Sequence, residues 1–305
     1  IETAVREATS GELTLEKTES YLRRIHQLAN PNFKVVSVAE HLTEWASAQE
    51  SYVSAKSLAT YFDMVRRMTK AFGDTVSSKP IGDLTKADVE KALTKIVRMN
   101  VKGTQRKIKA ATANMDLGAI RRALNDAVEK DYARINVAQG IRPLPTNDST
   151  ERAPFTTEEV RQLIDHPSTS DQWKGMILIA AHTGLRIGDI TRLNEKNVQG
   201  TRLIVRPEKT KKTRKTIIVP LSPPCLRWIE GRKEDLFPEF KGAKTGTLST
   251  QFVRIMERAG IPRDIVEADH AIKRRSFHSL RHTFTSWLAD ADVHADVRQK
   301  LTGHK

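Results

Sequence analysis

A nine-residue stretch near the end of the chain constrains fold and function more than any other, since residues 276–284 read SFHSLRHTF. Its apolar positions suit a helix, and helical residues three and four apart share one face. His278, Arg281 and His282 are therefore expected to point in one direction. A guanidinium beside an imidazole suits a phosphate, because the guanidinium binds two oxygens while the imidazole handles a proton.

This stretch has two other interpretations. The spacing His-x-x-x-His could supply two zinc ligands, but the metalloprotease motif has Glu directly after the first His, where Ser279 stands. Only one cysteine, Cys225, is present to complete such a site, and we predict no metal. The other alternative is a purely structural basic helix. The rest of the chain helps to choose among a phosphate site, a zinc site and a structural helix.

The charge balance points to an anionic partner. Lys plus Arg number 51 against 37 for Asp plus Glu, the net charge is +14, and the pI is about 9.9. Such a surplus suits a nucleic-acid backbone, although ribosomal, membrane-surface and heparin-binding proteins share it. The lone cysteine excludes an internal disulfide. No apolar run approaches the roughly 20 residues that span a bilayer, so we expect a soluble cytoplasmic protein without a membrane partner.

The chain of 305 residues is long enough for about two domains. Residues 142–152 contain two prolines and a polar run and predict an interdomain linker. Residues 36–141 are expected to form one domain and residues 153–305 another. Residues 1–35 are expected to hold a helix over 13–28 that connects to an upstream part, because the chain does not begin with Met.

The domain over 36–141 is predicted to be a bundle of four helices. Helical spacing and caps place them over 38–49, over 54–72 ending at Gly73, from Thr85 through residue 97, and from after Gly103 and Thr104 to about residue 130. Four cations crowd the predicted start of the fourth helix, where the helix dipole disfavours them, so a phosphate backbone or a solvated charged face must compensate. They are Lys102, Arg106, Lys107 and Lys109.

The domain over 153–305 is expected to be α+β, which makes the fold mainly α with a small β-sheet. Thr156 and Glu159 have capping-box spacing, and helices are predicted over 173–181, after Ser222, over 248–259 and over 293–301. Residues 203–205 and 216–219 alternate as strands of a hairpin with a strongly basic tip. Arg186 lies at a helix junction in an apolar stretch and needs an anion there, for which Asp189 is the structural candidate.

Four motifs in order carry a resemblance. Residues 183–186 read TGLR, Lys209-Thr210 follows the first hairpin strand, His278 and Arg281 form His-x-x-Arg, and residues 301–304 read LTGH, with Thr302 where Leu is more usual. Together they resemble the tyrosine recombinases, the phage-integrase family, from about residue 36 to the end. The resemblance implies a helical core DNA-binding domain and a catalytic domain that close on duplex DNA.

The resemblance also implies the catalytic roles. Arg186 and Arg281 would bind the nonbridging phosphate oxygens, and His278 would accept or share the proton of the nucleophile. Lys209 would protonate the departing 5′ oxygen, and His304 would hydrogen-bond the phosphate. Neither metal, ATP nor another cofactor is implied. Further DNA contacts are expected from a basic set of residues, namely Lys102, Arg106, Lys107, Lys109, Lys211, Lys212, Arg214, Arg274 and Arg275.

The nucleophile of the family is a tyrosine about nine residues after the late histidine, and it forms a 3′-phosphotyrosyl intermediate. The tyrosines of this chain stand at 21, 52, 61 and 132, so residues 1–305 include no match and are expected to bind DNA without cleaving it. The implied activity is integration and excision of a mobile element. The implied partners are double-stranded DNA, further copies in a tetrameric synapse, and accessory DNA-bending proteins, at the nucleoid.

Three rival functions stay open. A type IB topoisomerase-like enzyme would use the same chemistry but reseal its own strand. A decayed integrase would bind DNA without catalysis, although a full set of motif residues argues against decay. A metal-dependent nuclease would need clustered carboxylates, and none with ligand-like spacing stand near the histidines.

Overall fold

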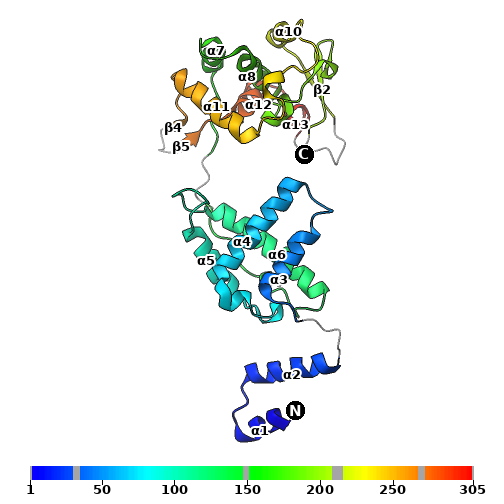
Figure 1. The fold of residues 1–305 in the computed structure, drawn as a ribbon. Coiled ribbons are helices and arrows are strands. Elements are labelled where there is room, and N and C mark those ends of the chain that lie inside the picture. The colour runs from blue at the N-terminus through cyan, green and yellow to red at the C-terminus, as the bar shows by residue number, and fades with distance from the viewer. Residues whose placement is uncertain (1, 30–34, 147–150, 208–215, 267–271, 304–305) are drawn as a thin grey trace. The chain divides into compact units, whose positions relative to one another are not determined.

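The computed structural model describes residues 2–29, 35–146, 151–207, 216–266 and 272–303 (Figure 1). The chain divides into two compact units, Ile1–Ser149 and Thr150–Lys305. It is mostly helical with two small antiparallel sheets, which confirms the predicted fold class. Within the described ranges, no helix has the length and apolarity that crossing a membrane requires.

The first unit opens with a helical pair, α1 (Glu2–Ser10) and α2 (Leu15–Ala29). The helix predicted over 13–28 is α2, whereas α1 was not predicted. Two contacts to Glu7 join the pair: Lys17 Nζ lies 3.1 Å from Glu7 Oε1, and the Tyr21 hydroxyl donates to Glu7 Oε2 at 3.1 Å. Both contacts are between side chains at the surface or only partly buried, so they tie the helices together weakly.

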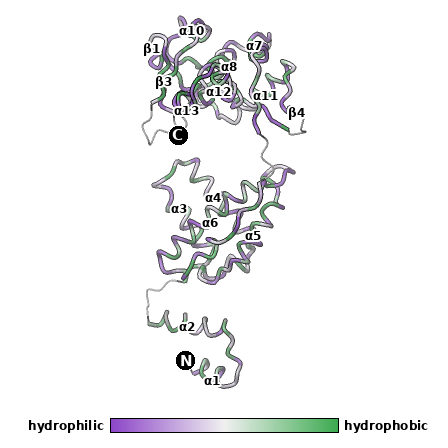
Figure 2. Tube along the Cα trace, turned by 180° about the vertical axis from the view of Figure 1, so that it is seen from behind, coloured by the Kyte–Doolittle hydropathy of each residue, from purple (hydrophilic) through white to green (hydrophobic). Residues whose placement is uncertain are grey.

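The four predicted helices of the first unit are all present. They are α3 (Val38–Ala48), α4 (Ala55–Ser77), α5 (Lys86–Arg98) and α6 (Ala110–Glu129), with the short 3-10 helix η1 (Ile81–Asp83) between α4 and α5. Hydrophobic and hydrophilic residues alternate along them (Figure 2), as expected of helices that each bury one face. Gly73, with φ of 73°, interrupts α4, but a further turn continues to Ser77 rather than ending there.

The start of the fourth helix differs from the prediction. Helix α6 begins at Ala110, and residues 99–108 form a loop with its own backbone pairing, in which Val101 N donates to Arg106 O at 2.7 Å and Ile108 N to Met99 O at 2.9 Å. These hydrogen bonds pair backbone N–H and C=O groups of the loop with one another, so the loop does not need to be helical to satisfy them. Three of the four predicted cations therefore lie in this loop, and Lys109 is the N-cap of α6.

The second unit surrounds α8 (Asp171–Thr183), which follows α7 (Thr157–Asp165) and leads into the single turn α9 (Ile187–Ile190). The capping box of Thr156 and Glu159 opens α7 as predicted. The other elements are η2 (Glu195–Asn197), β1 (Val198–Gln199), β2 (Arg202–Val205), β3 (Ile217–Pro220), α10 (Pro223–Ile229), η4 (Pro238–Phe240), α11 (Thr245–Arg258), β4 (Asp264–Val266), β5 (Ile272–Arg274), α12 (Ser279–Asp290) and α13 (Ala295–Thr302).

Both sheets of this unit are antiparallel. The predicted hairpin is β2 and β3, with Val205 opposite Ile217, and β1 adds a third strand beside β2. The second hairpin, β4 and β5, was not predicted. Strand β5 leads directly into the stretch 276–284, so the sheet fixes where that stretch begins.

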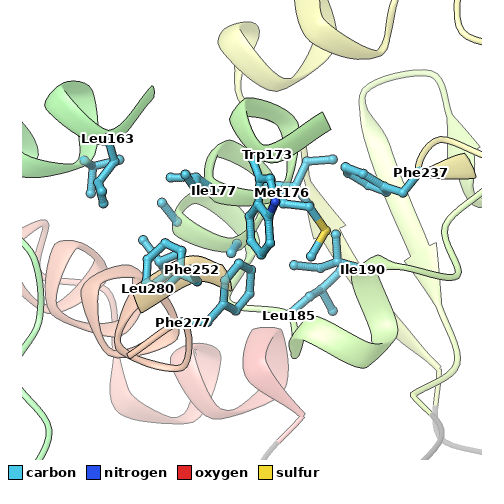
Figure 3. Close-up of a cluster of buried hydrophobic side chains, with 14 of the residues drawn as sticks. Leu163, Trp173, Met176, Ile177, Leu185, Ile190, Phe237, Phe252, Phe277 and Leu280 are labelled. Carbon is cyan, nitrogen blue, oxygen red and sulfur yellow. The ribbon is translucent and has the colours of Figure 1, made fainter. Parts of the chain in front are cut away.

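The core of the second unit anchors the motif stretch. Met176 and Ile177 of α8 are fully buried, and Phe277 packs edge-on against Phe252 at 5.2 Å and against Trp173 at 6.2 Å between ring centroids (Figure 3). Aromatic burial of this kind is worth several kcal/mol, about 3–5 for truncation to alanine. Phe277 therefore fixes the backbone position from which the next residue, His278, projects.

Candidate active site

The N-terminal end of α12 carries the two histidines of the motif stretch. His278 is the N-cap, Ser279 begins the helix, and the neighbouring Leu280 is fully buried in the core. The ring centroids of His278 and His282 lie 5.4 Å apart at an interplanar angle of 72°. Both side chains are half-buried, so they are held by the protein yet reachable from solvent.

Arg281 points into the protein and joins three segments. Its side chain is 3% exposed; Nη1 donates to Gly184 O at 2.7 Å and Nη2 donates to Thr302 O. Burial and the nearby charge of Arg186 lower its pKa to about 10, so it remains a cation near pH 7. Its Nε is buried without a hydrogen-bond partner among the described residues, which leaves one donor for an anion.

Arg186 lies next to Arg281 but is held quite differently. It is the N-cap of α9, two residues after Gly184, whose φ of 63° turns the chain out of α8. Its half-buried guanidinium donates no hydrogen bond to a described residue. The structural candidate for its counterion, Asp189, accepts instead from Arg192 at 2.8 Å. Two guanidinium groups thus converge with one of them unpaired, which is the arrangement an anion site requires.

His278 lies in a strongly positive environment. Burial first, then the charges of Arg152, His282, Arg281 and Arg186, lower its pKa to about 4. Burial and the charges of Arg152 and Arg281 lower the pKa of His282 as well. Near pH 7 the imidazole of His278 is therefore neutral and able to accept a proton.

The structure brings three predicted catalytic residues together, namely Arg186, His278 and Arg281. Lys209 and His304 lie outside the described residues, as do Lys211, Lys212 and Arg214. The segments beside them nevertheless converge, because Leu301 packs against a cluster of Ile217, Val219 and Phe284. Thr302 is buried and donates its hydroxyl to Arg298 O at 2.8 Å, so threonine satisfies its own polar group where leucine is more usual.

The loop before α6 exposes the four cations predicted to contact DNA in the first unit. Lys102 and Arg106 are exposed, Lys107 Nζ donates to Arg98 O at 2.8 Å while remaining exposed, and Lys109 is exposed at the helix N-cap. One short loop therefore concentrates positive charge at the surface.

Arg274 and Arg275, two further predicted DNA contacts, both pair with acidic residues. Arg274 is exposed but pairs with Asp264 through two hydrogen bonds of 2.6 and 3.1 Å. Arg275 is 5% exposed, and both of its Nη atoms donate to Glu159 at 2.7 Å. A DNA contact by Arg275 would require breaking this buried pair, so we leave it out of the proposed interface.

Arg152 lies beside the site although residues 142–152 were predicted to form the interdomain linker. Arg152 Nη1 donates to Ser276 Oγ at 2.9 Å, at the start of the motif stretch. No local pattern marks this residue, because the contact joins positions 124 apart in the chain. Among the described residues, no group of three His, Cys, Asp or Glu side chains could hold a metal ion.

Comparison with known proteins identifies a family match and similar recombinases. Residues 154–305 match the Phage integrase family. Tyrosine recombinase XerD of Mycobacterium tuberculosis is 24% identical over 273 residues, which are 84% of this chain and 85% of that protein. The putative integrase/recombinase y4eF of Sinorhizobium fredii is 25% identical over 205 residues, 66% of this chain and 77% of its own length.

The fold of this chain is also similar to those of solved integrase structures. A lambda integrase tetramer bound to a Holliday junction superposes with a TM-score of 0.73 at 19% identity, covering 99% of this chain and 86% of that chain. Tn1549 transposon integrase in complex with a circular intermediate DNA gives a TM-score of 0.70 at 17% identity, covering 88% and 92%.

Proposed function

This chain belongs to the phage integrase family of tyrosine recombinases, and we propose that it is a site-specific recombinase that cuts and rejoins DNA for integration and excision of a mobile element. One observation carries the proposal: the guanidinium of Arg186, which donates no hydrogen bond to a described residue, lies within electrostatic range of the buried Arg281 and of a neutral His278. A phosphodiester in this position would receive two cations and one proton acceptor.

The chemistry follows from the charge that develops on phosphorus. A tyrosine oxygen attacks, the Tyr O–P bond forms, and the P–O5′ bond breaks. Arg186 and the Nε of Arg281 bind the nonbridging oxygens as negative charge grows on them. His278 takes or shares the tyrosine proton, Lys209 gives a proton to the leaving 5′ oxygen, and His304 hydrogen-bonds the phosphate. The number of phosphoester bonds is unchanged, so the step needs no ATP.

The proposed substrate is double-stranded DNA. The related lambda integrase is a tetramer on a Holliday junction in its solved structure, which supports a homotetrameric synapse here. The proposed backbone contacts are Arg274 and the two basic loops, namely Lys102, Arg106, Lys107 and Lys109 before α6 and Lys211, Lys212 and Arg214 in the hairpin tip. Action on chromosomal DNA would place the protein in the cytoplasm at the nucleoid, with accessory DNA-bending proteins as further partners.

A strand-exchange assay tests this function. The complete protein is mixed with a plasmid and a labelled duplex that carry the ends of its own element, in EDTA. The proposal predicts recombinant products from the wild type and none from Arg186→Ala. Relaxation of the plasmid without recombinants would identify a topoisomerase-like enzyme instead, and salt-sensitive binding without either product would identify a non-catalytic DNA-binding protein.

A further inference from the structure

Arg152 is fixed beside the active site by backbone pairing. Residues 151–153 run along β5, where Arg274 N donates to Glu151 O at 2.7 Å and Ala153 N to Arg274 O at 3.4 Å. This pairing belongs to the second unit, so residue 152 is part of that unit and not of the predicted linker. It sets Arg152 level with the end of β5, from which the chain continues to Ser276.

The side chain of Arg152 reaches the turn that carries His278. Its Nη1 donates to Ser276 Oγ at 2.9 Å, while Ser276 N donates to Ser279 Oγ at 3.1 Å. Ser276 is thus bonded on one side to Arg152 and on the other to the first residue of α12. A movement of Arg152 would therefore move the turn that presents His278.

Among the described residues, Arg152 also has no acidic partner, unlike Arg274 and Arg275 on the neighbouring strand segment. Arg274 pairs with Asp264, and Arg275 pairs with Glu159. The described residues provide no acidic partner for Arg152, whose guanidinium is exposed and holds one neutral hydroxyl. Of the neighbouring charges, that of Arg152 nevertheless contributes most to lowering the pKa of both His278 and His282. An exposed guanidinium beside two histidines, with no acidic partner among the described residues, keeps its remaining donors available to an anion.

We propose that Arg152 is a phosphate-binding and positioning residue of this active site, which binds the DNA backbone phosphate beside the one cleaved and orients His278 through Ser276. The inference rests on the proposed function. Arginine suits both tasks, because its five donors in a fixed plane allow one nitrogen to hold Ser276 while the others take phosphate oxygens. A lysine could neutralise the phosphate but could not make both contacts in one fixed geometry.

The test compares three variants of the complete protein: Arg152→Ala, Arg152→Lys and the matched control Arg161→Ala. Arg161 is exposed on α7 in the same unit, so its loss removes the same charge away from the site. The first measurement is DNA affinity against salt. Arg152→Ala is expected to reduce the slope of log affinity against log salt by about 0.9, the value for one phosphate contact. Arg152→Lys and Arg161→Ala are expected to keep the wild-type slope.

The second measurement is the rate of covalent adduct formation against pH on nicked duplexes. Loss of a charge-assisted contact is expected to slow Arg152→Ala about 10–100-fold, with Arg152→Lys slowed as well and Arg161→Ala unchanged. The third is the pKa of His278 by NMR without DNA. It should rise in Arg152→Ala, because a neighbouring cation is removed, and should stay low in Arg152→Lys and Arg161→Ala.

Failure of this inference and failure of the proposed function give different results. If the wild type forms an adduct and Arg152→Ala matches Arg161→Ala in rate, slope and His278 pKa, Arg152 has no such role. If the wild type forms no adduct, the recombinase function is rejected. The salt dependence of DNA binding then decides by itself whether Arg152 binds a phosphate. An unchanged slope in Arg152→Ala rejects phosphate binding, and a reduced slope retains it for a non-catalytic DNA-binding protein.

Discussion

At the scale of single residues, Arg186 and Arg281 carry the same charge but are held in opposite ways. Arg281 donates to two buried carbonyl oxygens, whereas Arg186 donates no hydrogen bond to a described residue. The first therefore contributes to the fold as well as to the proposed phosphate binding, and the second has no role in the fold among the described residues beyond its N-cap position. Their variants should separate stability from activity.

We expect Arg281→Ala to lower the free energy of unfolding by about 1–3 kcal/mol, since buried carbonyl partners lose their donor. Arg186→Ala should stay within about 0.5 kcal/mol of the wild type, and both should abolish DNA cleavage. Urea unfolding of the two variants measures the difference. Equal loss of stability in both would contradict the different roles assigned to them.

The histidines predict how stability depends on pH. The pKa of His278 in the folded protein is about 4, below its ordinary value of about 6.5, and those of His282 and His182 are lowered as well. The folded state therefore favours the neutral imidazoles. Their contribution to stability is complete above pH 6.5 and is lost as the pH falls from about 6.5 toward 4.

Urea unfolding between pH 7 and 4 checks this expectation. His278→Gln is expected to reduce the slope of the free energy of unfolding against pH, because one group with a lowered pKa is removed. A stability that rises on acidification across this window, or a His278 pKa above 6.5 by NMR, would show that the site is less positive than the structure indicates. Bound DNA should raise the His278 pKa, because phosphate offsets the surrounding cations.

At the scale of elements, the turn between α8 and α9 depends on Gly184. Its φ is 63°, and a Cβ there would lie 2.6 Å from Phe284 Cδ1. Gly242 has a similar φ of 74°, but a Cβ would meet nothing within 4 Å. Both alanine variants incur the left-handed backbone cost of about 1–2 kcal/mol.

Gly184→Ala should lose about 1–3 kcal/mol beyond Gly242→Ala, from overpacking against Phe284. It should also slow DNA cleavage, because the Gly184 carbonyl accepts a hydrogen bond from Arg281, whereas Gly242→Ala should not. Thermal unfolding and adduct formation measure the two effects. Identical losses of stability and of cleavage rate in Gly184→Ala and Gly242→Ala would mean that α12 does not pack against this turn as described.

The ion pair between Arg275, which directly follows β5, and Glu159 of α7 predicts a second contrast. Arg275→Ala breaks the buried pair with Glu159 and should cost about 3 kcal/mol of stability, without changing the salt dependence of DNA binding. Arg106→Ala, in the exposed loop before α6, should leave stability unchanged and reduce the salt slope by about 0.9. A reduced salt slope of DNA binding for Arg275→Ala would show that Arg275 does contact DNA.

At the scale of the whole molecule, local signals predicted most of the fold. Most helices of both units, though not α1, follow from helical spacing and caps such as Thr85 and Thr156, and the β2–β3 hairpin follows from alternation. The β4–β5 hairpin was missed because Ile272 and Val266 are exposed and give no inward pattern. The four motifs likewise identified Arg186, His278 and Arg281, whose convergence the structure then describes.

What the sequence could not predict depends on contacts between distant positions. The pair of Arg275 with Glu159 spans 116 positions, and that of Arg152 with Ser276 spans 124. Three arginines therefore end in different environments: Arg275 is buried in an ion pair, Arg274 is paired at the surface, and Arg152 is exposed with no acidic partner among the described residues. Only the tertiary fold decides which basic residue is free to meet an anion.

Covalent trapping tests the central claim most directly. The complete protein and its Arg186→Ala variant are each incubated in EDTA with nicked duplexes from the ends of their element, resolved on denaturing gels and mapped by proteolysis. We predict a metal-independent 3′-phosphotyrosyl adduct from the wild type, and none from Arg186→Ala despite unchanged folding. Salt-sensitive DNA binding without an adduct, or attachment through a residue other than tyrosine, would contradict the account.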